Sequence, residues 1–496
     1  MEVLKFASRC FAALVLVAVP AHAADYSIAD RVFDEYRLDA HVPGLVYGIV
    51  ADGRLVHAGT FGVQDTASGR PVTADSLFRV ASMTKALTAL TVLKLRDDGR
   101  LRLDAPASEY VPEMRNWDYP TGDSPQIRVR DLLNHAGGFV TDDPWGDRQT
   151  PLPEAEFTKL LAGGVPFTTV PGTRYEYSNL GYALLGRIVT NVSKSPYAET
   201  IKRTLLQPLG MNASGFDADA APRGQRALGY RWEDDAWRLE PTLGPGTFGA
   251  MGGLQTNAND YAKWVTFLLS AWPPRDGPDD GPVRRATVRE LAQGSNYPRI
   301  RDRPARSGTP PSRQPIAYGM GMIVAIDDVL GLTISHSGGY PGYGSHVLLL
   351  PDRGVGLFAF ANRTYAGPSR AVWDAAIALD DAGLLGHERE SATSEALASA
   401  YRAAGAMYRA GSVEVAHELL AMNFQLDRDA GHWSREFAGL KAEVGECETS
   451  APISPTGALS GDFTWRCDRG RVDGSLLLAP TRPPTIQALD LSPIKP

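Results

Sequence analysis

Residues 77–90 read LFRVASMTKALTAL, and the expected fold and chemistry follow from this stretch outward. Ser82 and Lys85 stand three residues apart, where a loop enters a helix that the apolar spacing predicts from Met83 to Leu95. Side chains at this spacing share one face of a helix, so the lysine amine can approach the serine hydroxyl. The helix N-terminus also supplies backbone N–H groups and a positive field for a developing oxyanion. The pattern therefore predicts a nucleophile beside a candidate base.

The Ser-x-x-Lys pattern is weakly informative when it stands alone, because a chain of this composition contains roughly half a match by chance. In the alternative interpretation, Ser82 caps the helix and Lys85 is solvated. A second match runs from Ser492 to Lys495 at the C-terminal end, between prolines, where no helix can hold the pair together. We interpret this second match as chance.

A second candidate motif lies in residues 171–186, PGTRYEYSNLGYALLG, where a turn leads into an amphipathic helix predicted through Ala183–Val192. A helix start of this kind can present Tyr177 and Asn179 to a cleft. Tyrosine can relay a proton, and asparagine can hold an amide carbonyl. The alternative is that Ser178 or Asn179 only caps the helix while Tyr177 packs.

A third candidate motif, HSGG at His336–Gly339, follows the strand-like segment LTIS and precedes a turn. This context would place an imidazole that can carry a charge, and exposed backbone N–H groups, at the edge of a sheet. A near copy, HAGG at His135–Gly138, follows the helix-like VRDLLN instead. For His135 we therefore expect a structural role, as a buried imidazole hydrogen-bonded to backbone.

In this order and context the three motifs resemble the serine β-lactamase and penicillin-binding superfamily, most closely its branch of class C β-lactamases, D,D-carboxypeptidases, D-aminopeptidases and related esterases. The resemblance extends over about residues 27–385 and includes two stretches without a catalytic role, VRDLLNHAGG at 129–138 and FGAMGGLQTNANDYAKW at 248–264. It implies an α+β fold of the β-lactamase type, in which an antiparallel sheet is flanked by helices and a helical subdomain borders the site.

The resemblance also implies a role for each matched residue. Ser82 is then the acylated nucleophile, and Lys85 and Tyr177 share the general-base and general-acid work. Asn179 positions the substrate amide, and the backbone N–H groups of Ser82 and Gly339 form the oxyanion hole. Which of Lys85 and Tyr177 is the main base stays open at this point.

The third motif departs from the Lys-Thr-Gly usual in class C β-lactamases. His336-Ser337-Gly338 stands in its place, a form that resembles D,D-peptidases and D-aminopeptidases. We place His336 and Gly338, with Asn179 and Gly339, among the substrate-binding and oxyanion residues. A lysine is permanently charged and favours a substrate carboxylate, whereas a histidine with an unperturbed pKa of about 6.5 is only partly charged at neutral pH. Efficient β-lactam hydrolysis is therefore in doubt.

Two interpretations of His336 remain open from the sequence. If its imidazolium holds a substrate carboxylate, activity on such substrates should fall as the pH rises through the histidine pKa. In the alternative, His336 only braces the strand through hydrogen bonds.

These motifs predict an exported serine hydrolase that cleaves an amide, peptide or ester bond through an acyl-serine intermediate. It would be of the D,D-peptidase, D-aminopeptidase or esterase type, with weak β-lactamase activity as a further option. The substrate would be a small molecule or short peptide, with cell-wall fragments among the candidates. The alternative is a non-catalytic or slowly acylating sensor or binding module on the same fold, although binding alone needs no base. An α/β-hydrolase would carry a Gly-x-Ser-x-Gly elbow, which the chain lacks.

The sequence implies no cofactor and no metal. Three cysteines are too few, and nine histidines too scattered, for a zinc motif, and HExxH is absent. A formal charge of −7 has the wrong sign for binding a phosphate backbone, so we expect no nucleic-acid partner.

Strand and helix signals follow a distinctive order along the chain. Residues 45–62 indicate a β-hairpin around Asp52-Gly53, and helices dominate the middle of the chain. Strands return over 318–361 before a helix at 371–385. This order predicts one sheet into which a helical subdomain is inserted. Residues 272–315, rich in proline and arginine, are predicted to form an exposed excursion around one short helix.

A change of composition near residue 388 indicates a second unit. We assign residues 24–388 to the serine hydrolase domain and residues 390–496 to a separate small α+β accessory domain. No motif in this second domain indicates a particular chemistry. Cys447 and Cys467 lie in this second unit and can form a disulfide that closes a loop of about 20 residues. Two buried thiols are the alternative.

Residues 1–23 have the pattern of a secretory signal peptide that is cut before Ala24. Lys5 and Arg9 precede an apolar run from Cys10 to Val19, and a small-residue cleavage pattern follows. A membrane anchor would need about 18 or more apolar residues, and this run has roughly half that number. We therefore expect a periplasmic or secreted protein, with no transmembrane segment after cleavage, in a compartment that oxidises cysteines.

Overall fold

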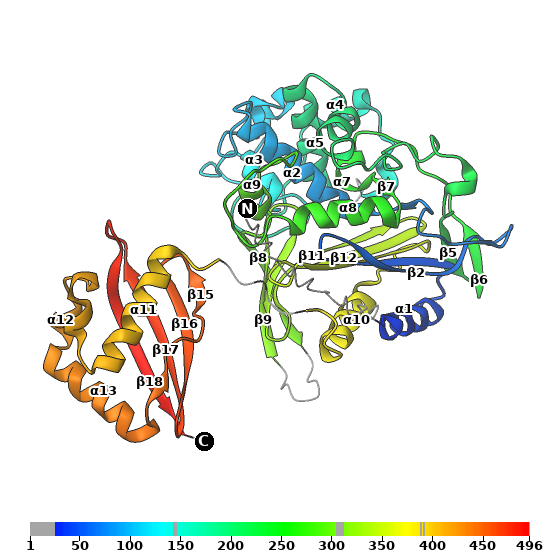
Figure 1. Ribbon diagram of the computed structural model, residues 1–496. Coiled ribbons are helices and arrows are strands. Elements are labelled where there is room, and N and C mark those ends of the chain that lie inside the picture. The colour runs from blue at the N-terminus through cyan, green and yellow to red at the C-terminus, as the bar shows by residue number, and fades with distance from the viewer. Residues whose placement is uncertain (1–24, 142–145, 304–311, 387–388, 390–391, 496) are drawn as a thin grey trace, which may run out of the picture.

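The computed structural model describes residues 25–141, 146–303, 312–386, 389 and 392–495 (Figure 1). The expected signal peptide, residues 1–23, lies outside this described part of the chain. So do residues on both sides of the expected domain boundary near 388–390.

A nine-stranded antiparallel sheet forms the centre of the larger unit, in the order β3-β2-β1-β13-β12-β11-β10-β9-β8. Its strands are β1 (Gly44–Ala51), β2 (Arg54–Asp65), β3 (Arg70–Pro71), β8 (Asn296–Arg303), β9 (Ser312–Tyr318), β10 (Ile323–Asp327), β11 (Gly331–Tyr340), β12 (Tyr343–Leu350) and β13 (Val355–Ala361). The predicted β1–β2 hairpin is confirmed: Asp52 and Gly53 form its two-residue turn with φ angles of 50° and 71°.

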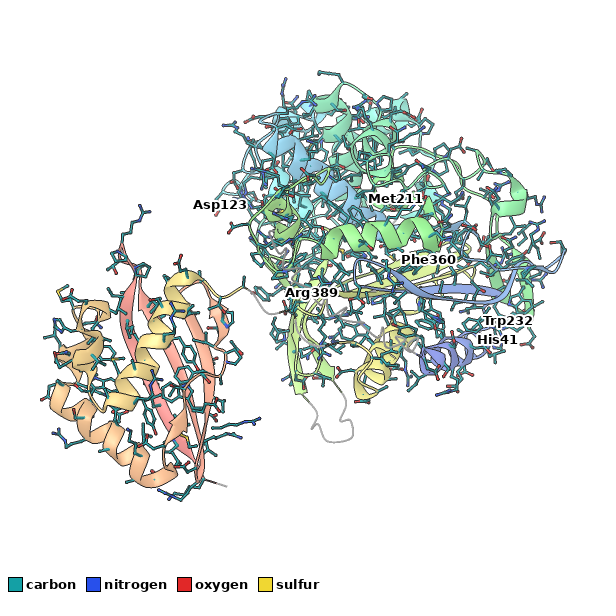
Figure 2. The ribbon with its side chains drawn as sticks, viewed as in Figure 1. His41, Asp123, Met211, Trp232, Phe360 and Arg389 are labelled. Carbon is teal, nitrogen blue, oxygen red and sulfur yellow. A yellow bond between two sulfur atoms is a disulfide. The ribbon has the colours of Figure 1, made fainter. Side chains whose placement is uncertain are left out.

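Helices cover both faces of this sheet (Figure 1). They are α1 (Ser27–Asp39) and α10 (Ser369–Asp381) on one face, and α2 (Thr84–Asp97) and α8 (Ala258–Leu269) on the other. Phe33 of α1 belongs to the core between these two helices and the sheet. On the opposite face Phe360 packs against Tyr261 of α8, with ring centroids 5.3 Å apart (Figure 2). The sheet is therefore buried on both faces, which explains why β1 and β13 are apolar along most of their length.

A helical subdomain is inserted between the first and last strands of the sheet, as the order of signals predicted. It comprises α3 (Val129–Leu133), α4 (Glu154–Ala162), α5 (Asn179–Ser193), α6 (Tyr197–Ile201), α7 (Gly249–Gly252) and α9 (Arg285–Glu290), with the short strand pairs β4 (Phe78–Arg79)·β7 (Gln255–Thr256) and β5 (Tyr230–Glu233)·β6 (Ala236–Leu239). Trp232 stacks on His41 with ring centroids 4.4 Å apart, which ties the β5–β6 hairpin to the end of α1 (Figure 2).

The structure corrects the expectation for residues 272–315. This segment contains α9, as a short helix, but it also contributes β8 and the start of β9, which extend the sheet. The proline and arginine content of this segment had favoured a loop over strands. β8 is an edge strand, however, and an edge position tolerates both the charge and the missing N–H of Pro298.

The C-terminal unit has its own antiparallel sheet, in the order β14-β16-β17-β18, with β15 beside β16. Its elements are α11 (Glu395–Ala410), α12 (Phe424–Asp427), α13 (Ala430–Val444), β14 (Cys447–Glu448), β15 (Ser454–Gly457), β16 (Ser460–Cys467), β17 (Gly470–Ala479) and β18 (Thr485–Ile494). All its buried core residues fall between Leu397 and Leu489. Cys447 and Cys467 face each other across β14 and β16 and form a disulfide. The α+β class predicted from the sequence is confirmed.

In the part of the chain that the structure describes, no helix is both long enough and apolar enough to cross a membrane.

Candidate active site

Ser82 lies in a single turn of 3-10 helix, η1 (Ala81–Met83), that leads directly into α2. Ala81 has a left-handed backbone, with φ at 48°, a conformation that non-glycine residues adopt rarely and at a cost in free energy. Thr84 stabilises this turn: its hydroxyl donates to the Ala81 carbonyl at 2.7 Å and accepts the Leu254 N–H at 3.2 Å. Ser82 is therefore held on a strained, fixed turn, a form of strain that is common at functional sites.

Lys85 is the first charged residue of α2, and its side chain is fully buried. Its ammonium nitrogen lies 3.0 Å from Ser82 Oγ, 2.7 Å from Asn179 Oδ1 and 2.8 Å from the Met251 carbonyl oxygen. Three acceptors match the three N–H groups of an ammonium, which compensates the burial of its charge. The structure thus joins the predicted serine–lysine pair, and the interpretation of Lys85 as a solvated side chain is wrong.

The second motif meets the first through Asn179. Ser178 is the N-cap of α5, because its hydroxyl accepts the Gly181 N–H at 3.1 Å, and Asn179 is the first helical residue. Asn179 is buried, and its side-chain oxygen accepts from Lys85. Tyr177 precedes the cap, and the Lys85 ammonium lies 4.9 Å from the centre of its ring. The capping role considered in the sequence analysis therefore belongs to Ser178, whereas Tyr177 and Asn179 lie beside Lys85.

His135 lies behind this second motif. It is fully buried, its backbone is left-handed with φ at 60°, and its Nδ1 accepts the Ser178 N–H at 3.1 Å. Its ring centroid is 4.3 Å from that of Tyr177. Burial, and then the charge of Lys85, lower the pKa of His135 well below the usual histidine range. The expected buried imidazole hydrogen-bonded to backbone is confirmed.

The third motif lies entirely within β11, which continues to Tyr340 rather than ending before the glycines. Strand β10 pairs with β11 only as far as Ser335, whereas β12 pairs with it up to Tyr340. From residue 336 onward, no strand among the described residues therefore pairs with this edge of β11. Tyr340 and Tyr343 flank the two-residue turn between β11 and β12, so they hydrogen-bond to each other. Along an antiparallel strand, successive residues direct their N–H and C=O groups alternately toward the paired strand and away from it. Ser337 and Gly339 therefore direct these groups to the open edge.

Gly338 brings the open edge close to the nucleophile. A Cβ atom at this position would lie 2.3 Å from the Val80 carbonyl oxygen and 3.0 Å from Cβ of Ala81. Only glycine permits this close approach of β11 to the turn that carries Ser82. The Gly339 N–H and Ser82 then border the same space, an arrangement that suits an oxyanion hole.

His336 differs from the expectation of a partly charged imidazole. It is almost fully buried; its Nδ1 lies 2.6 Å from the Ser337 carbonyl oxygen, and its Nε2 lies 3.1 Å from the Tyr318 hydroxyl. Burial first, and the charge of Lys85 second, lower the pKa of His336 to about 3, although the bond to Ser337 acts in the opposite direction. The ring is neutral at physiological pH, so the expected loss of activity through a pKa near that of a free histidine has no basis here.

Two contributors to the site were missed by the sequence analysis. The Met251 carbonyl of α7 anchors Lys85, and the stretch 248–264 had already indicated a family-like segment without assigning it a role. Tyr318 of β9 reaches His336 across the sheet, and nothing in the local sequence marks it, because only the strand register brings the two together. Among the described residues, no group of three or more histidine, cysteine or acidic side chains could hold a metal ion.

The chain matches known proteins over most of the larger unit. The family described as Beta-lactamase matches residues 29–382. Protein flp of Staphylococcus aureus strain N315 is 27% identical over 340 residues, which cover 67% of this chain and 62% of that protein. Esterase EstB of Burkholderia gladioli is 31% identical over 199 residues, which cover 38% of this chain and 50% of that protein. The chain thus spans less than two thirds of the length of these two relatives.

Two solved structures are similar in fold. The octameric penicillin-binding protein homologue from Pyrococcus abyssi matches with a TM-score of 0.58 and 22% identity, over 92% of this chain and 97% of that one. A class C β-lactamase matches with a TM-score of 0.58 and 19% identity, over 71% of this chain and 96% of that one. At these identities the likeness shows the fold alone.

Proposed function

Because this chain belongs to the β-lactamase family of serine hydrolases, we propose that it cleaves an ester, amide or peptide bond through an acyl intermediate on Ser82. One observation carries the proposal. A fully buried lysine amine lies 3.0 Å from the serine hydroxyl, on a turn that faces the open edge of β11. A protein that only binds ligand has no need for such a pair.

The residues divide the chemistry among them in the following way. The substrate carbonyl lies between Ser82 and β11, where the N–H groups of Ser82 and Gly339 receive the oxyanion. Lys85 donates to the serine oxygen and stabilises negative charge there, and Asn179 fixes the lysine. Tyr177 borders the lysine and exchanges the proton between serine, leaving group and the water that releases the acyl group. An ammonium with three acceptors is a donor in the resting state, which favours Tyr177 as the main base.

For the bond that is cleaved, we propose esters and uncharged amides ahead of β-lactams. One matched relative is an esterase by name. The neutral state of His336 removes the positive charge that a lysine in the third motif would offer to a substrate carboxylate. D,D-peptidase and D-aminopeptidase activity remain the other members of this proposal, with a slowly acylating sensor as the alternative function.

We further propose that the protein acts outside the cytoplasm, as a periplasmic or secreted enzyme. The N-terminal pattern of residues 1–23 and the disulfide between Cys447 and Cys467 both support this location.

Covalent labelling tests the proposed function. The protein that begins at Ala24 is treated with a fluorophosphonate and, separately, with a penicillin, and intact mass and peptide mapping follow. We expect one fluorophosphonate adduct, located on Ser82, and none in Ser82→Ala, which should retain the fold while turnover is abolished. An adduct that persists in Ser82→Ala would refute the assignment of the nucleophile. A wild-type protein that labels but releases no product would favour the sensor.

A further inference from the structure

The contact between Tyr318 and His336 joins two strands of the main sheet directly behind the third motif. Tyr318 ends β9, and His336 is the first residue of β11 beyond its pairing with β10. The tyrosine is fully buried and the histidine is 3% exposed. Their polar atoms lie 3.1 Å apart, within hydrogen-bond distance.

The second bond of His336 fixes the direction of the first. A carbonyl oxygen can only accept, so the contact of 2.6 Å between Nδ1 and the Ser337 oxygen places a proton on Nδ1. In the neutral ring Nε2 is then an acceptor, so the Tyr318 hydroxyl is the donor of this bond. The same hydroxyl also contacts that of Tyr182, which donates its own proton to the Leu133 carbonyl oxygen. The bonds therefore run in one direction, from Tyr318 through His336 to the carbonyl of Ser337, which lies on the open edge of β11.

The surroundings of the ring oppose a positive charge on it. The titratable groups that face this ring or its neighbour Tyr318 are Lys85 of α2, His135 after α3, Tyr175 and Tyr177 before α5, Tyr182 within α5 and His346 of β12. None of these groups is a carboxylate, and Lys85 is already a buried cation. Burial also raises the pKa of Tyr318 well above the usual tyrosine range, so its hydroxyl keeps its proton and can donate it in a hydrogen bond.

From this geometry we infer that Tyr318 is a positioning residue that holds His336 as an uncharged hydrogen-bond acceptor, and that the open edge of β11 consequently selects acyl donors with no carboxylate beside the scissile carbonyl. The inference rests on the proposed function for its substrate class. Its structural half, the direction of the hydrogen bonds, does not depend on activity. A carboxylate placed along this edge would lose its water and find a neutral imidazole instead of a cation.

Nitrogen-15 spectra of histidine-labelled protein test the structural half. We expect the His336 signals, assigned by their loss in His336→Gln, to show a proton on Nδ1 and none on Nε2 from pH 5.5 to 8. In Tyr318→Phe the Nε2 signal should shift, because its donor is gone. Tyr230→Phe is the matched control: it removes another buried hydroxyl, which accepts the Thr66 N–H far along the chain from this motif. A doubly protonated His336 at pH 7, or an Nε2 signal that Tyr318→Phe leaves unmoved, would overturn the inference.

Two esters that differ in one carboxylate test the substrate half, namely p-nitrophenyl butyrate and mono-p-nitrophenyl succinate. We expect wild-type kcat/KM to favour the butyrate at least tenfold, and Tyr318→Phe to lower kcat for it about tenfold with little change in KM, the effect of one lost hydrogen bond. His336→Gln, which keeps an uncharged acceptor, should retain the preference for the butyrate, whereas His336→Lys should narrow it, because a lysine offers a substrate carboxylate the positive charge that the imidazole lacks. An unchanged preference in His336→Lys, or no preference in the wild type, would refute the selection.

Fluorophosphonate labelling distinguishes a failure of the proposed function from a failure of the inference about Tyr318 and His336. If wild-type Ser82 does not label, the proposed function fails, while the nitrogen-15 result still decides the direction of the hydrogen bonds. If Ser82 labels and Tyr318→Phe behaves like Tyr230→Phe in both measurements, the inference alone fails.

Discussion

Two stretches of this chain carry nearly the same letters, HAGG after α3 and HSGG within β11, and the fold uses their histidines in opposite ways. Both rings lie near Tyr177, with centroid distances of 4.3 Å for His135 and 6.3 Å for His336. Nδ1 of His135 accepts a backbone N–H, whereas Nδ1 of His336 donates to a backbone carbonyl. The two neutral rings therefore carry their protons on different nitrogens.

The difference comes from the backbone that each ring meets. The start of α5 offers N–H groups that lack partners within the helix, so His135 serves as an acceptor for Ser178. The open edge of β11 offers a carbonyl, so His336 serves as a donor to Ser337. Burial and the nearby Lys85 lower the pKa of both rings. A short motif thus identifies an imidazole near the site, while its surroundings decide its charge and its hydrogen bonds.

The largest expected effect comes from removing the neighbours that both histidines share. Lys85→Ala and Tyr177→Phe should each slow acylation by roughly 100-fold or more, because each removes a group that handles the serine proton or its charge. Stopped-flow acylation by a chromogenic ester measures this. Lys94→Ala, at a partly exposed lysine further along α2 that pairs with Asp98, is the control. If both variants acylate at nearly the normal rate, the base lies elsewhere, and the two neighbours that the histidines share are not the groups that handle the serine proton.

The next largest effect is on the free energy of unfolding, to which we expect the buried hydrogen bond of His135 to contribute. His135→Ala should lower the free energy of unfolding by about 3 kcal/mol, because it leaves the buried Ser178 N–H without an acceptor and opens a cavity. His135→Asn should lose about half as much, since asparagine tolerates the left-handed backbone and its oxygen can accept. Urea unfolding measures both values. Equal losses would show that the acceptor at residue 135 contributes nothing.

The smallest expected effect is a pH dependence of stability. The unfolded chain protonates its histidines below pH about 6.5, whereas folded His336 stays neutral down to about pH 3. The contribution of His336 to the free energy of unfolding is therefore fully present above about pH 6.5 and falls as the pH drops toward 3, by up to about 1.4 kcal/mol per pH unit. The loss between pH 7 and pH 5 should be roughly 2 kcal/mol smaller in His336→Gln than in wild type or Tyr230→Phe. An unchanged loss would mean that folded His336 takes up a proton as readily as the unfolded chain does.

Much of the fold could be predicted because it depends on local pattern. The β1–β2 hairpin has its turn dipeptide, and the helix after Ser82 and the α5 helix have clear apolar spacing. The strand β8 was missed, since an edge strand does not need the apolar alternation that identifies a buried one. The start of β9, which lies between β10 and β8, was missed because the prolines and arginines around it favoured a loop. The Ser82–Lys85 contact could be expected from helical spacing alone.

The rest of the site depends on contacts between distant segments. No local pattern places Tyr318 against His336, because β9 and β11 are brought together by the register of β10 between them. The neutral state of His336 likewise depends on burial and on Lys85, neither of which can be judged from the letters HSGG. The left-handed turn at Ala81 was also unforeseen, because alanine gives no sign of it.

That turn places two selection pressures in conflict at one residue. Glycine would adopt the left-handed conformation of Ala81 without strain, and it would also loosen the turn that aims the nucleophile. Laboratory evolution for heat resistance and laboratory evolution for turnover should consequently favour different residues at position 81. The residue found there in an evolved lineage would record which property its history had rewarded.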